Sequence, residues 1–417
     1  MAQYQSIVMG VDVGSSEICT LVAGSHPETE QIVLLGMGVT PSTGLRRGMV
    51  VDIDSMSRAI GDSIELAVKE AGVHPDQAYV SIAGEHIVSL NSTGVIGISK
   101  RGNAPATIAE ITEDHVAQVL EAAKAMKLPE GREIIHTIPQ QFAVDEEHGI
   151  LNPVGMTGRR LESQTHLITG SQSATRNLVH AFTWSGTKVR QFVFSALAAS
   201  RSTLSKDEQN IGVGLLDIGR DATTCVVFNE FDVQYSDVLS IASGAISSDI
   251  SQLLRITASQ ADELKIKYGS CWVEDTARDK LFEVKGVGGR PDENVSETEL
   301  AEYIEARMDE ILHLERDRMF RAGVLKYLHS GIVITGGGAR LRGLIPLAEK
   351  IFQVPVRIGT PRDISDPNNP ARLQDSAYCT AAGLVLYAME DAGGGRWNRK
   401  QVGKFLGRIK DFLKDNF

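Results

Sequence analysis

The sequence "LLDIGRDATTCVVF", residues 215–228, reads as an apolar strand, a turn that follows Asp217, and a second apolar strand. The sequence "GVDVGSSEICTLVAG", residues 10–24, has the same layout, and its Asp12 lies 205 residues before Asp217. A hairpin that only reverses the chain favours a two-residue Asn-Gly or Asp-Gly turn. Here each turn instead follows an aspartate at the end of a buried run, so the repeated hairpin indicates a function beyond chain reversal.

Each turn also carries a glycine, Gly14 in the first hairpin and Gly219 in the second. Glycine lets the backbone approach a ligand, and successive N–H groups of a tight turn form a concavity that binds anions. An aspartate beside each turn suits Mg²⁺, which proteins often hold through one or two carboxylates and the substrate phosphates. We therefore expect two turns that grip one polyphosphate, with Mg²⁺ held through water by Asp12 and Asp217.

A third element of the same kind is "VITGGGARLRGL", residues 333–344. It reads as a strand, then Gly336, Gly337 and Gly338, then a helix. The glycines let the backbone lie flat against a nucleotide, and a helix N-terminus favours phosphate. Each element alone is more often an ordinary turn, but the three in this order favour a nucleotide site.

The composition bounds the class of protein. The chain has 417 residues, 42% of them apolar, and a formal charge of −11. This length predicts two to four domains, and the negative charge argues against a nucleic-acid binder, which needs a basic surface. The four cysteines are scattered without metal-ligand spacing, as is typical of a reduced cytoplasmic protein. We expect no signal peptide and no membrane-spanning segment.

Strand and helix patterns alternate along both halves of the chain. Residues 53–71 carry apolar side chains at helical spacing and end at Gly72. The next segment, "AYVSIAG", reads as a buried strand, and the final "AYCTAAGLVLYAME" reads as a helix rich in small residues. Residues 84–161 and 230–299 interrupt this alternation as insertions. The pattern predicts an α/β fold with parallel or mixed sheets in two facing halves.

The three nucleotide elements, in this order, resemble those of the actin, Hsp70 and hexokinase superfamily. Within it, "IIHTIPQQFAVDEEHGILNPVGMTGRRLESQTHLIT" and "GGRPDENVSETELAEYIEARMDEIL" are similar to the FtsA family of bacterial cell-division proteins. The basic amphipathic C-terminal segment fits the same family. The resemblance extends from about residue 6 to residue 417.

The resemblance implies an actin-like ATPase fold of two facing lobes, each with an inserted subdomain, followed by a C-terminal amphipathic helix. The subdomains are expected at 1–83, 162–194 and 355–390 (1A), 84–161 (inserted 1C), 195–229 and 300–354 (2A), 230–299 (2B), and 391–417 (linker and membrane-targeting helix).

The resemblance also implies that the chain binds ATP or ADP with Mg²⁺. The expected binding residues are Asp12, Gly14, Ser15, Ser16, Asp217, Gly219, Arg220, Asp262, Lys265, Gly336, Gly337 and Gly338. Two departures stand out. Cys19 occupies the place of actin's phosphate-reaching lysine, and Arg220 and Asp221 replace two glycines of the family's second turn. Arg220 is expected to reach a phosphate, or else the site is degenerate and binds nucleotide weakly.

Several of these residues have a plainer interpretation. Asp262 and Lys265 lie one turn apart on a predicted helix, where a solvated pair is at least as expected as a contact to ribose or adenine. His136 and His166 lie in apolar surroundings and are expected to be hydrogen-bonded core histidines. No nucleophilic triad, metal cluster or secure general base is evident, so no catalytic residue is assigned and the nucleotide is expected to act as a structural or switching ligand.

The family's role implies partners for the chain. These are the C-terminal peptide of the tubulin-like protein FtsZ, later division proteins, anionic lipids of the inner membrane, and further copies of the chain in a filament, but no nucleic acid. The FtsZ peptide is expected around Arg290 and Arg307, as a segment with acidic and apolar residues. Ordinary surface charge is the alternative interpretation of the two arginines.

The C-terminal 22 residues differ in charge from the rest of the chain. Residues 396–417 contain seven basic and two acidic residues and follow the glycine-rich "AGGGR". An apolar stripe beside basic side chains is typical of a helix that lies on an anionic membrane, although a helix packed on the body would show the same stripe. The expected membrane contacts are Lys404, Phe405, Leu406, Arg408, Ile409, Phe412 and Leu413.

The sequence therefore predicts an ATP-binding, polymerising adaptor rather than an enzyme, peripheral to the cytoplasmic face of the inner membrane at the division site. The alternatives are a small-molecule kinase of the same superfamily and an actin-like scaffold of a pilus machine. A kinase has no use for the amphipathic C-terminal segment, and that segment and the expected FtsZ-docking region also argue against a pilus scaffold.

Overall fold

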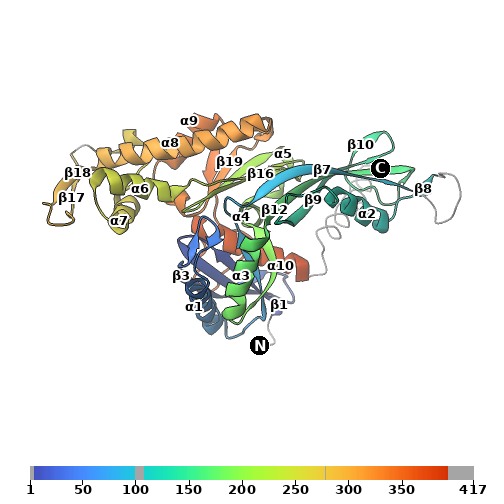
Figure 1. The fold of residues 1–417 in the computed structure, drawn as a ribbon, viewed down its shortest axis with the longest axis horizontal. Helices are drawn as coiled ribbons and strands as arrows, with labels where there is room; N and C mark the ends of the chain where they lie inside the picture. The colour runs from blue at the N-terminus through green and yellow to red at the C-terminus, as the bar shows by residue number, and fades with distance from the viewer. Residues whose placement is uncertain (1–3, 99–107, 278, 393–417) are drawn as a thin grey trace.

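A computed structural model describes residues 4–98, 108–277 and 279–392. Two five-stranded mixed sheets form the centres of two lobes (Figure 1). The sheet of the first lobe has the order β13 (Lys188–Phe194), β6 (Gln77–Ile82), β1 (Gln5–Val13), β2 (Glu17–Ser25) and β3 (Ile32–Pro41). The sheet of the second lobe has the order β16 (Asp232–Leu239), β15 (Thr223–Asn229), β14 (Val213–Ile218), β19 (Ile332–Thr335) and β20 (Val356–Ile358). The predicted α/β fold is confirmed.

Helices cover both faces of the first sheet. They are α1 (Ile53–Ala71) and α3 (Gln172–Trp184) on one face, and α4 (Ser195–Thr203) and α10 (Cys379–Ala392) on the other. The Asp52 side chain caps α1 by accepting the N–H groups of Asp54 and Ser55, and Gly72 ends the helix in the left-handed conformation. The helix predicted from apolar spacing is thus confirmed. A short ribbon of β4 (Leu45–Arg46) and β5 (Met49–Val50) precedes α1.

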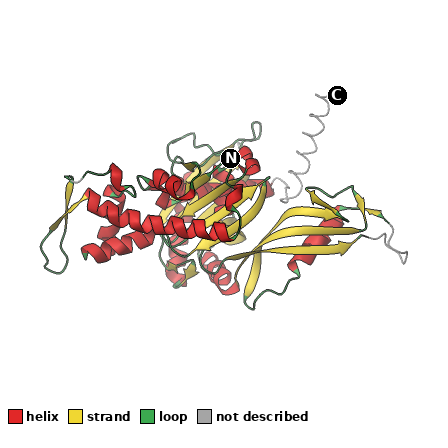
Figure 2. Ribbon diagram, turned by 90° about the horizontal axis from the view of Figure 1, so that it is seen from above, coloured by secondary structure: helices red, strands yellow, loops and turns green. Residues whose placement is uncertain are grey.

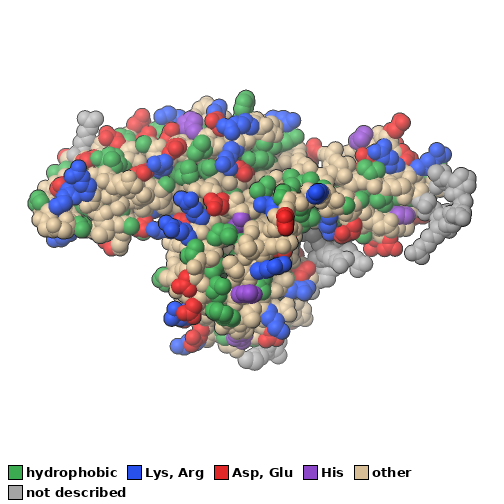
Figure 3. Space-filling view, viewed as in Figure 1, with side chains coloured by type: hydrophobic (Ala, Val, Ile, Leu, Met, Phe, Trp, Pro, Cys, Tyr) green, Lys and Arg blue, Asp and Glu red, His purple; other side chains and the backbone are tan. Residues whose placement is uncertain are grey.

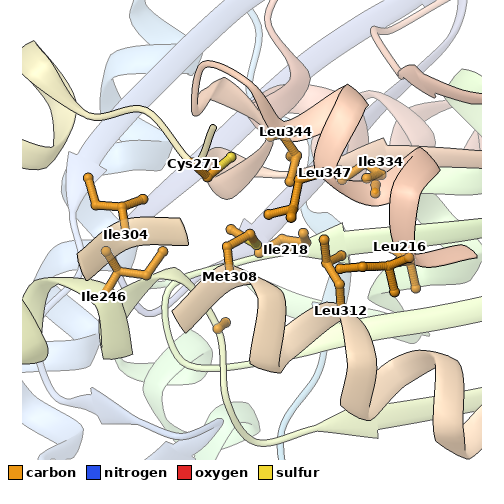
Figure 4. Close-up of a cluster of buried hydrophobic side chains, with 14 of the residues drawn as sticks. Leu216, Ile218, Ile246, Cys271, Ile304, Met308, Leu312, Ile334, Leu344 and Leu347 are labelled. Atoms are coloured by element: carbon orange, nitrogen blue, oxygen red, sulfur yellow. The ribbon is translucent and has the colours of Figure 1, made fainter. Parts of the chain in front are cut away.

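The second lobe has its own core, formed where α8 (Glu297–Arg321) and α9 (Leu344–Phe352) pack on the sheet (Figure 4). Met308 and Leu312 of α8 are fully buried beside Leu216 and Ile218 of β14. This packing fixes the strand that ends near Asp217. The short α5 (Lys206–Ile211) joins α4 to β14.

Each lobe carries an insertion, and the two insertions extend to opposite ends of the molecule (Figures 1 and 2). The first consists of β7 (Val88–Gly97), β8 (Ala109–Glu110), α2 (Glu113–Lys124), β9 (Arg132–Val144), β10 (Glu147–Ile150), β11 (Thr157–Gly158) and β12 (Arg160–Ser171). The second consists of α6 (Ser243–Leu254), α7 (Ala258–Tyr268), η1 (Val273–Asp275), β17 (Leu281–Val284) and β18 (Glu293–Ser296). Three further 3₁₀ helices lie in the lobes: η2 (Leu325–Tyr327), η3 (Gly337–Arg340) and η4 (Ser376–Tyr378).

Two expected subdomain boundaries are wrong. Strand β12 pairs with β7 and β9 as far as residues 169–171, so the first insertion continues well past residue 161. Residues 356–358 form β20, which pairs in parallel with β19, so this segment belongs to the second sheet and not to the first lobe. Both boundaries depend on pairing between strands distant in sequence, which local patterns do not encode.

The exposed charges are mixed in sign. Lys and Arg side chains alternate with Asp and Glu over the face seen in Figure 3. Among the described residues, no helix combines the length and apolar character that crossing a bilayer requires. The expected amphipathic segment at 396–417 lies outside the described residues.

Candidate functional site

The two repeated hairpins have the same backbone pairing. Strands β1 and β2 are antiparallel with Asp12 opposite Cys19, and β14 and β15 are antiparallel with Asp217 opposite Thr224. The second pair lies 205 residues after the first on both strands. The sequence repeat is therefore also a repeat in register.

The two turns are closed by equivalent hydrogen bonds. The Gly14 N–H donates to the Glu17 carbonyl at 3.1 Å, and the Gly219 N–H donates to the Ala222 carbonyl at 3.0 Å. Within residues 4–98 and 108–277, the N–H groups at the tips of the turns, at positions 15, 16, 220 and 221, donate to no protein acceptor. They are the groups that an anion-binding turn offers to phosphate oxygens.

Asp12 lies at the end of β1, beside the parallel strand β6. The Ser81 hydroxyl of β6 donates to Asp12 Oδ1 at 2.7 Å and accepts the Val13 N–H at 2.8 Å. Burial raises the pKa of Asp12 to about 7, against the opposing effect of the Ser81 hydrogen bond, and the charge of Asp217 raises it further. The two aspartates therefore interact across the site, although they belong to different lobes.

Asp217 has the corresponding place at the end of β14, beside the parallel strand β19. The Thr380 hydroxyl of α10 donates to Asp217 Oδ2 at 3.2 Å, so a helix of the first lobe supports the aspartate of the second. Burial raises the pKa of Asp217 to about 6, and the Thr380 hydrogen bond opposes this rise. Both aspartates are half-buried residues.

The glycine element packs directly against the second turn. Gly336 has φ 85° and ψ 175°, and a Cβ there would lie 2.4 Å from Asp217 Oδ1. A Cβ on Gly338 would lie 2.5 Å from the Ile218 Cγ2, whereas a Cβ on Gly337 would meet no atom within 4 Å. The backbone at Gly337 is therefore open to a ligand. The expected α-helix does not begin at the glycines, because Gly337 and Gly338 belong to the 3₁₀ helix η3 and α9 begins only at residue 344.

The second turn is also joined to α7. Arg220 Nη1 donates to Asp262 Oδ2 at 2.9 Å, and Lys265 Nζ lies 3.2 Å from Asp262 Oδ1. Lys265 also donates to the Ser243 carbonyl at 3.1 Å, and its side chain is only 11% exposed, so the interpretation of a solvated helix pair is wrong. Burial raises the pKa of Asp262, but hydrogen bonds from Ser247 and Arg220 outweigh this and hold the pKa below its usual value.

The structure thus brings the predicted nucleotide residues together from both lobes. A nucleotide with Mg²⁺ fits their chemistry, because two carboxylates face unpaired N–H groups and an open glycine backbone. Among the described residues, no group of three or more His, Cys, Asp or Glu residues is placed to hold a metal by itself. Water and phosphate oxygens would supply the rest of the shell of a Mg²⁺ held by Asp12 and Asp217.

Sequence reasoning missed three residues that position this site: Ser81, Thr380 and Ser376. Ser376 holds the glycine element, because its carbonyl accepts the Gly336 N–H at 3.1 Å and its hydroxyl donates to the Gly336 carbonyl at 3.0 Å. Ser81 and Thr380 are polar residues inside otherwise apolar segments, and this was the one signal the sequence held for them.

The two histidines are confirmed as core residues. His166 bonds Asn91 at 2.7 Å and Ser236 at 2.8 Å through its two ring nitrogens, and His136 Nε2 accepts the Phe194 N–H at 3.0 Å. Burial lowers the pKa of both to about 4. Both are therefore neutral at physiological pH.

Arg290 and Arg307, the residues expected to bind a peptide, lie in different settings. Arg307 is on α8 and forms a two-pronged ion pair with Asp249 of α6, at 2.6 and 3.0 Å, as well as an ion pair with Glu310. Arg290 instead pairs with Glu293 at 3.1 Å. Only Arg307 borders the cavity described next.

A cavity of about 400 Å³ lies between α6 and α8. Its lining consists of Asp249, Gln252, Leu253, Glu302, Tyr303, Ala306, Arg307 and Glu310. Three carboxylates and one guanidinium give it a net negative charge, although Asp249 and Glu310 are the partners of Arg307. The expected peptide with acidic and apolar residues stays a prediction, and the net negative charge of this lining favours basic side chains beside the apolar ones.

Comparisons with known proteins agree along the whole chain. The family model described as cell division protein FtsA matches residues 214–383, and the one described as SHS2 domain inserted in FTSA matches residues 84–169. The chain is 34% identical to the cell division protein FtsA of Pseudomonas aeruginosa, over 100% of both chains. It is 31% identical to that of Escherichia coli K12, over 100% of this chain and 99% of the relative.

Solved structures with the same fold are more distant in sequence. The PilM–PilN type IV pilus biogenesis complex has a TM-score of 0.65 at 16% identity and covers 91% of this chain and 98% of that one. MreB5 of Spiroplasma citri bound to ADP has a TM-score of 0.55 at 12% identity and covers 94% and 99%. At these identities the likeness establishes the actin-like fold alone.

Proposed function

Because the chain belongs to the FtsA family of cell division proteins, we propose that it is an adaptor that binds ATP and Mg²⁺, polymerises, and anchors the FtsZ ring to the inner membrane. Family membership establishes a cell division protein and argues against a kinase or a pilus scaffold. Nucleotide binding, polymerisation, FtsZ docking and membrane attachment are the parts that we propose.

The paired turns carry the nucleotide part of the proposal. Two hairpins with one register present Asp12 and Asp217 beside unpaired N–H groups, and Gly337 adds an open stretch of backbone. Bound Mg²⁺ would shield the charge of the phosphates. The turn N–H groups would hold the phosphates and Asp12 and Asp217 would hold the Mg²⁺ through water, while Asp262 and Lys265 would lie on the side of the nucleoside. A structure of the same fold contains ADP, which agrees with this use of the site.

The nucleotide would act as a switching ligand and not as a rapidly consumed substrate. Cys19, which is buried, stands where actin carries a lysine that reaches phosphate. Burial raises the pKa of this thiol well above its usual value, so it supplies no charge to the site. Without that cation, stabilisation of charge developing on a transferred phosphate would be weak.

Docking of FtsZ is proposed at the cavity between α6 and α8. Leu253 is 56% exposed there and offers apolar surface to a peptide, while Glu302 offers a partner to a basic side chain, since Asp249 and Glu310 already pair with Arg307. We assign the C-terminal segment of FtsZ to this cavity, with an apolar anchor and at least one cation. Later division proteins would bind other surfaces of the adaptor.

Membrane attachment is assigned to residues 396–417, outside the described part of the chain. Each basic residue near an anionic surface contributes about 1 kcal/mol, and each large apolar side chain adds about 1.5–3 kcal/mol when fully buried. One segment of this kind binds reversibly. A filament links many of them, because polymerisation converts later binding events into intramolecular ones.

Polymerisation is proposed to be head to tail, since an actin-like body offers different surfaces at its two ends that need not close into a ring. The first insertion would lie in that contact, because it projects from one end of the molecule (Figure 2).

Co-sedimentation with anionic liposomes, with and without ATP and FtsZ, tests the proposal. The full chain is expected to bind the liposomes and to recruit FtsZ. Phe412→Glu places a charge in the apolar stripe, and truncation from Val402 removes the stripe, so both should leave the protein in the supernatant with FtsZ-peptide binding intact. Truncated protein that sediments as the full chain does would place the membrane contact elsewhere.

A further inference from the structure

The second of the two repeated turns carries two charged residues, Arg220 and Asp221, at its tip. We propose that these two side chains form an interlobe clamp: Asp221 ties the turn to the first lobe, and Arg220 ties it to α7 of the second insertion. The clamp itself needs no nucleotide. Its coupling to nucleotide rests on the proposed function.

The first arm of the clamp crosses between the lobes. The Asp221 carboxylate accepts the backbone N–H of Arg47 at 3.0 Å, and Arg47 lies in the turn between β4 and β5 of the first lobe. The acceptor is charged, so this hydrogen bond is stronger than one between neutral groups. A glycine at position 221 has no side chain to make it.

The Arg47 turn is rigidly placed. Arg47 and Gly48 have φ of 50° and 78°, as a tight hairpin turn requires. A Cβ on Gly48 would lie 2.2 Å from the Ala83 carbonyl and 2.7 Å from Gly84 Cα, so the turn rests on the backbone just before the first insertion begins. The first arm therefore reaches a fixed point near the base of that insertion.

The base of that insertion is itself held by Arg132. Its guanidinium donates to the His86 carbonyl at 2.9 Å and to the Thr169 carbonyl at 3.0 Å, which joins the segment just before β7 to β12, the last strand of the insertion. A movement of the Arg47 turn would therefore displace the backbone at the point where the insertion leaves the first lobe.

The second arm remains within the second lobe. Arg220 pairs with Asp262 at 2.9 Å, and both side chains are partly buried, at 35% and 23% exposure. Lys265 and Ser247 occupy the other oxygen of the same carboxylate. The carboxylate that was expected to contact the nucleoside is thus already bound by protein groups.

The backbone of the turn is held as well. Ser243, the first residue of α6, donates its N–H to the Gly219 carbonyl at 3.1 Å, and the Gly244 N–H donates to the Arg220 carbonyl at 2.8 Å. A Cβ on Gly244 would lie 2.7 Å from that carbonyl. The turn is therefore the common contact of the second sheet, the second insertion and the first lobe, and its two side chains fix their relative position.

The lobe arrangement can be measured in the full chain by spin-label distance spectroscopy. The labels are placed at Glu65→Cys on α1 and Ile266→Cys on α7, both exposed positions. The four native cysteines are buried, so the introduced thiols react selectively. The first measurement uses no nucleotide, lipid or FtsZ.

The nucleotide-free chain is expected to give one narrow distance distribution. Asp221→Ala should broaden it and shift the closed-to-open ratio about three- to tenfold, the usual effect of losing one hydrogen bond. Asp221→Asn keeps an oxygen for the Arg47 N–H and should retain most of the closed population. Asp207→Ala, at an exposed aspartate of the same lobe, is the matched control and should change nothing.

The second arm is tested by charge exchange. Arg220→Asp alone should broaden the distribution, and Arg220→Asp combined with Asp262→Arg should narrow it again, because the ion pair is restored in the opposite sense. A merely structural role for either residue predicts no such rescue. Identical distributions for the native chain, Asp221→Ala and Arg220→Asp would overturn the clamp.

If Asp221→Ala does not fold, hydrogen exchange on the unaltered chain decides the first arm. The Arg47 amide should exchange at least about tenfold more slowly than the unpaired amides of Ser15 and Ser16. Equal exchange rates would contradict the contact.

Addition of MgATP then separates this inference from the proposed function. ATP should restore the narrow distribution of Asp221→Ala, because phosphates joined to both turns replace the missing arm. A clamp seen without nucleotide but no recovery with MgATP would retain the clamp and contradict the nucleotide site.

Discussion

The two repeated turns of this molecule share a backbone and differ in their side chains. Both are closed by a glycine N–H bonded three residues ahead, and both follow an aspartate at the end of a strand that has a parallel neighbour. At the tip of the first turn stand Ser15 and Ser16, whereas Arg220 and Asp221 stand at the tip of the second and are bonded to other parts of the protein. The hairpin backbone therefore sets the geometry of each turn, and the side chains at its tip are free to make contacts with other parts of the protein.

The side chains that donate hydrogen bonds to the two aspartates also differ between the turns. Asp12 is held by Ser81, from the sheet of its own lobe, while Asp217 is held by Thr380, from a helix of the other lobe. The first turn is thus a local structure, and the second is a junction. Changes at the second turn should therefore spread further through the molecule than equal changes at the first.

The largest effect on the free energy of unfolding is expected at Gly336, which packs against the second turn and not against the first. Gly336→Ala would place a Cβ 2.4 Å from Asp217 Oδ1 at a backbone conformation that only glycine adopts readily. We expect a loss of about 2–4 kcal/mol in the free energy of unfolding. Chemical denaturation measures it.

Gly337→Ala is the matched control for that substitution, since its Cβ would meet no atom within 4 Å. It should leave the free energy of unfolding nearly unchanged. Equal losses for the two variants would show that the glycine element does not support the second turn as described.

A smaller effect, in pH dependence, distinguishes the two aspartates. The folded pKa of Asp12 is about 7, against an ordinary 3.8, so the folded chain holds this proton more tightly than the unfolded chain does. The free energy of unfolding should therefore fall as pH rises from about 4 to 7 and then level off. Asp12→Asn cannot ionise, so its stability relative to the native chain should increase over this window.

Denaturation at several pH values checks this comparison. For Asp217→Asn the corresponding window should end near pH 6, because the folded pKa of Asp217 is about 6. The affinity for MgATP should increase over the same windows, since metal binding needs the ionised carboxylates. A stability of Asp12→Asn that follows that of the native chain at every pH between about 4 and 7 would contradict the raised pKa of Asp12.

The repeated hairpins and α1 could be predicted from sequence because their signals are local. Alternating apolar runs around an aspartate and glycine defined both turns, and helical spacing followed by Gly72 defined α1. The spacing of 205 residues implied that the two hairpins would pair in the same register. Which residues face each other within each hairpin came from the structure.

The parts that were mispredicted depend on contacts between distant segments. The limits of β12 and the place of β20 follow from strand pairing across the sheets, and the contact of Asp221 with Arg47 spans 174 residues. The sequence showed that Arg220 and Asp221 depart from the family, and it suggested a phosphate as the partner of Arg220. In the structure Arg220 pairs with Asp262 and Asp221 accepts the Arg47 N–H, and the contact of Arg220 with a phosphate stays a prediction.

The central claim is that both turns serve one nucleotide. Thermal unfolding with and without roughly millimolar ATP and Mg²⁺ tests it most directly, because a ligand that binds only the folded state stabilises that state. The native chain and Asp232→Ala, a control aspartate whose pKa burial also raises to about 7, should unfold at a higher temperature with MgATP, whereas Asp12→Ala and Asp217→Ala should show no such shift. A native chain that unfolds at the same temperature with and without MgATP would contradict the claim.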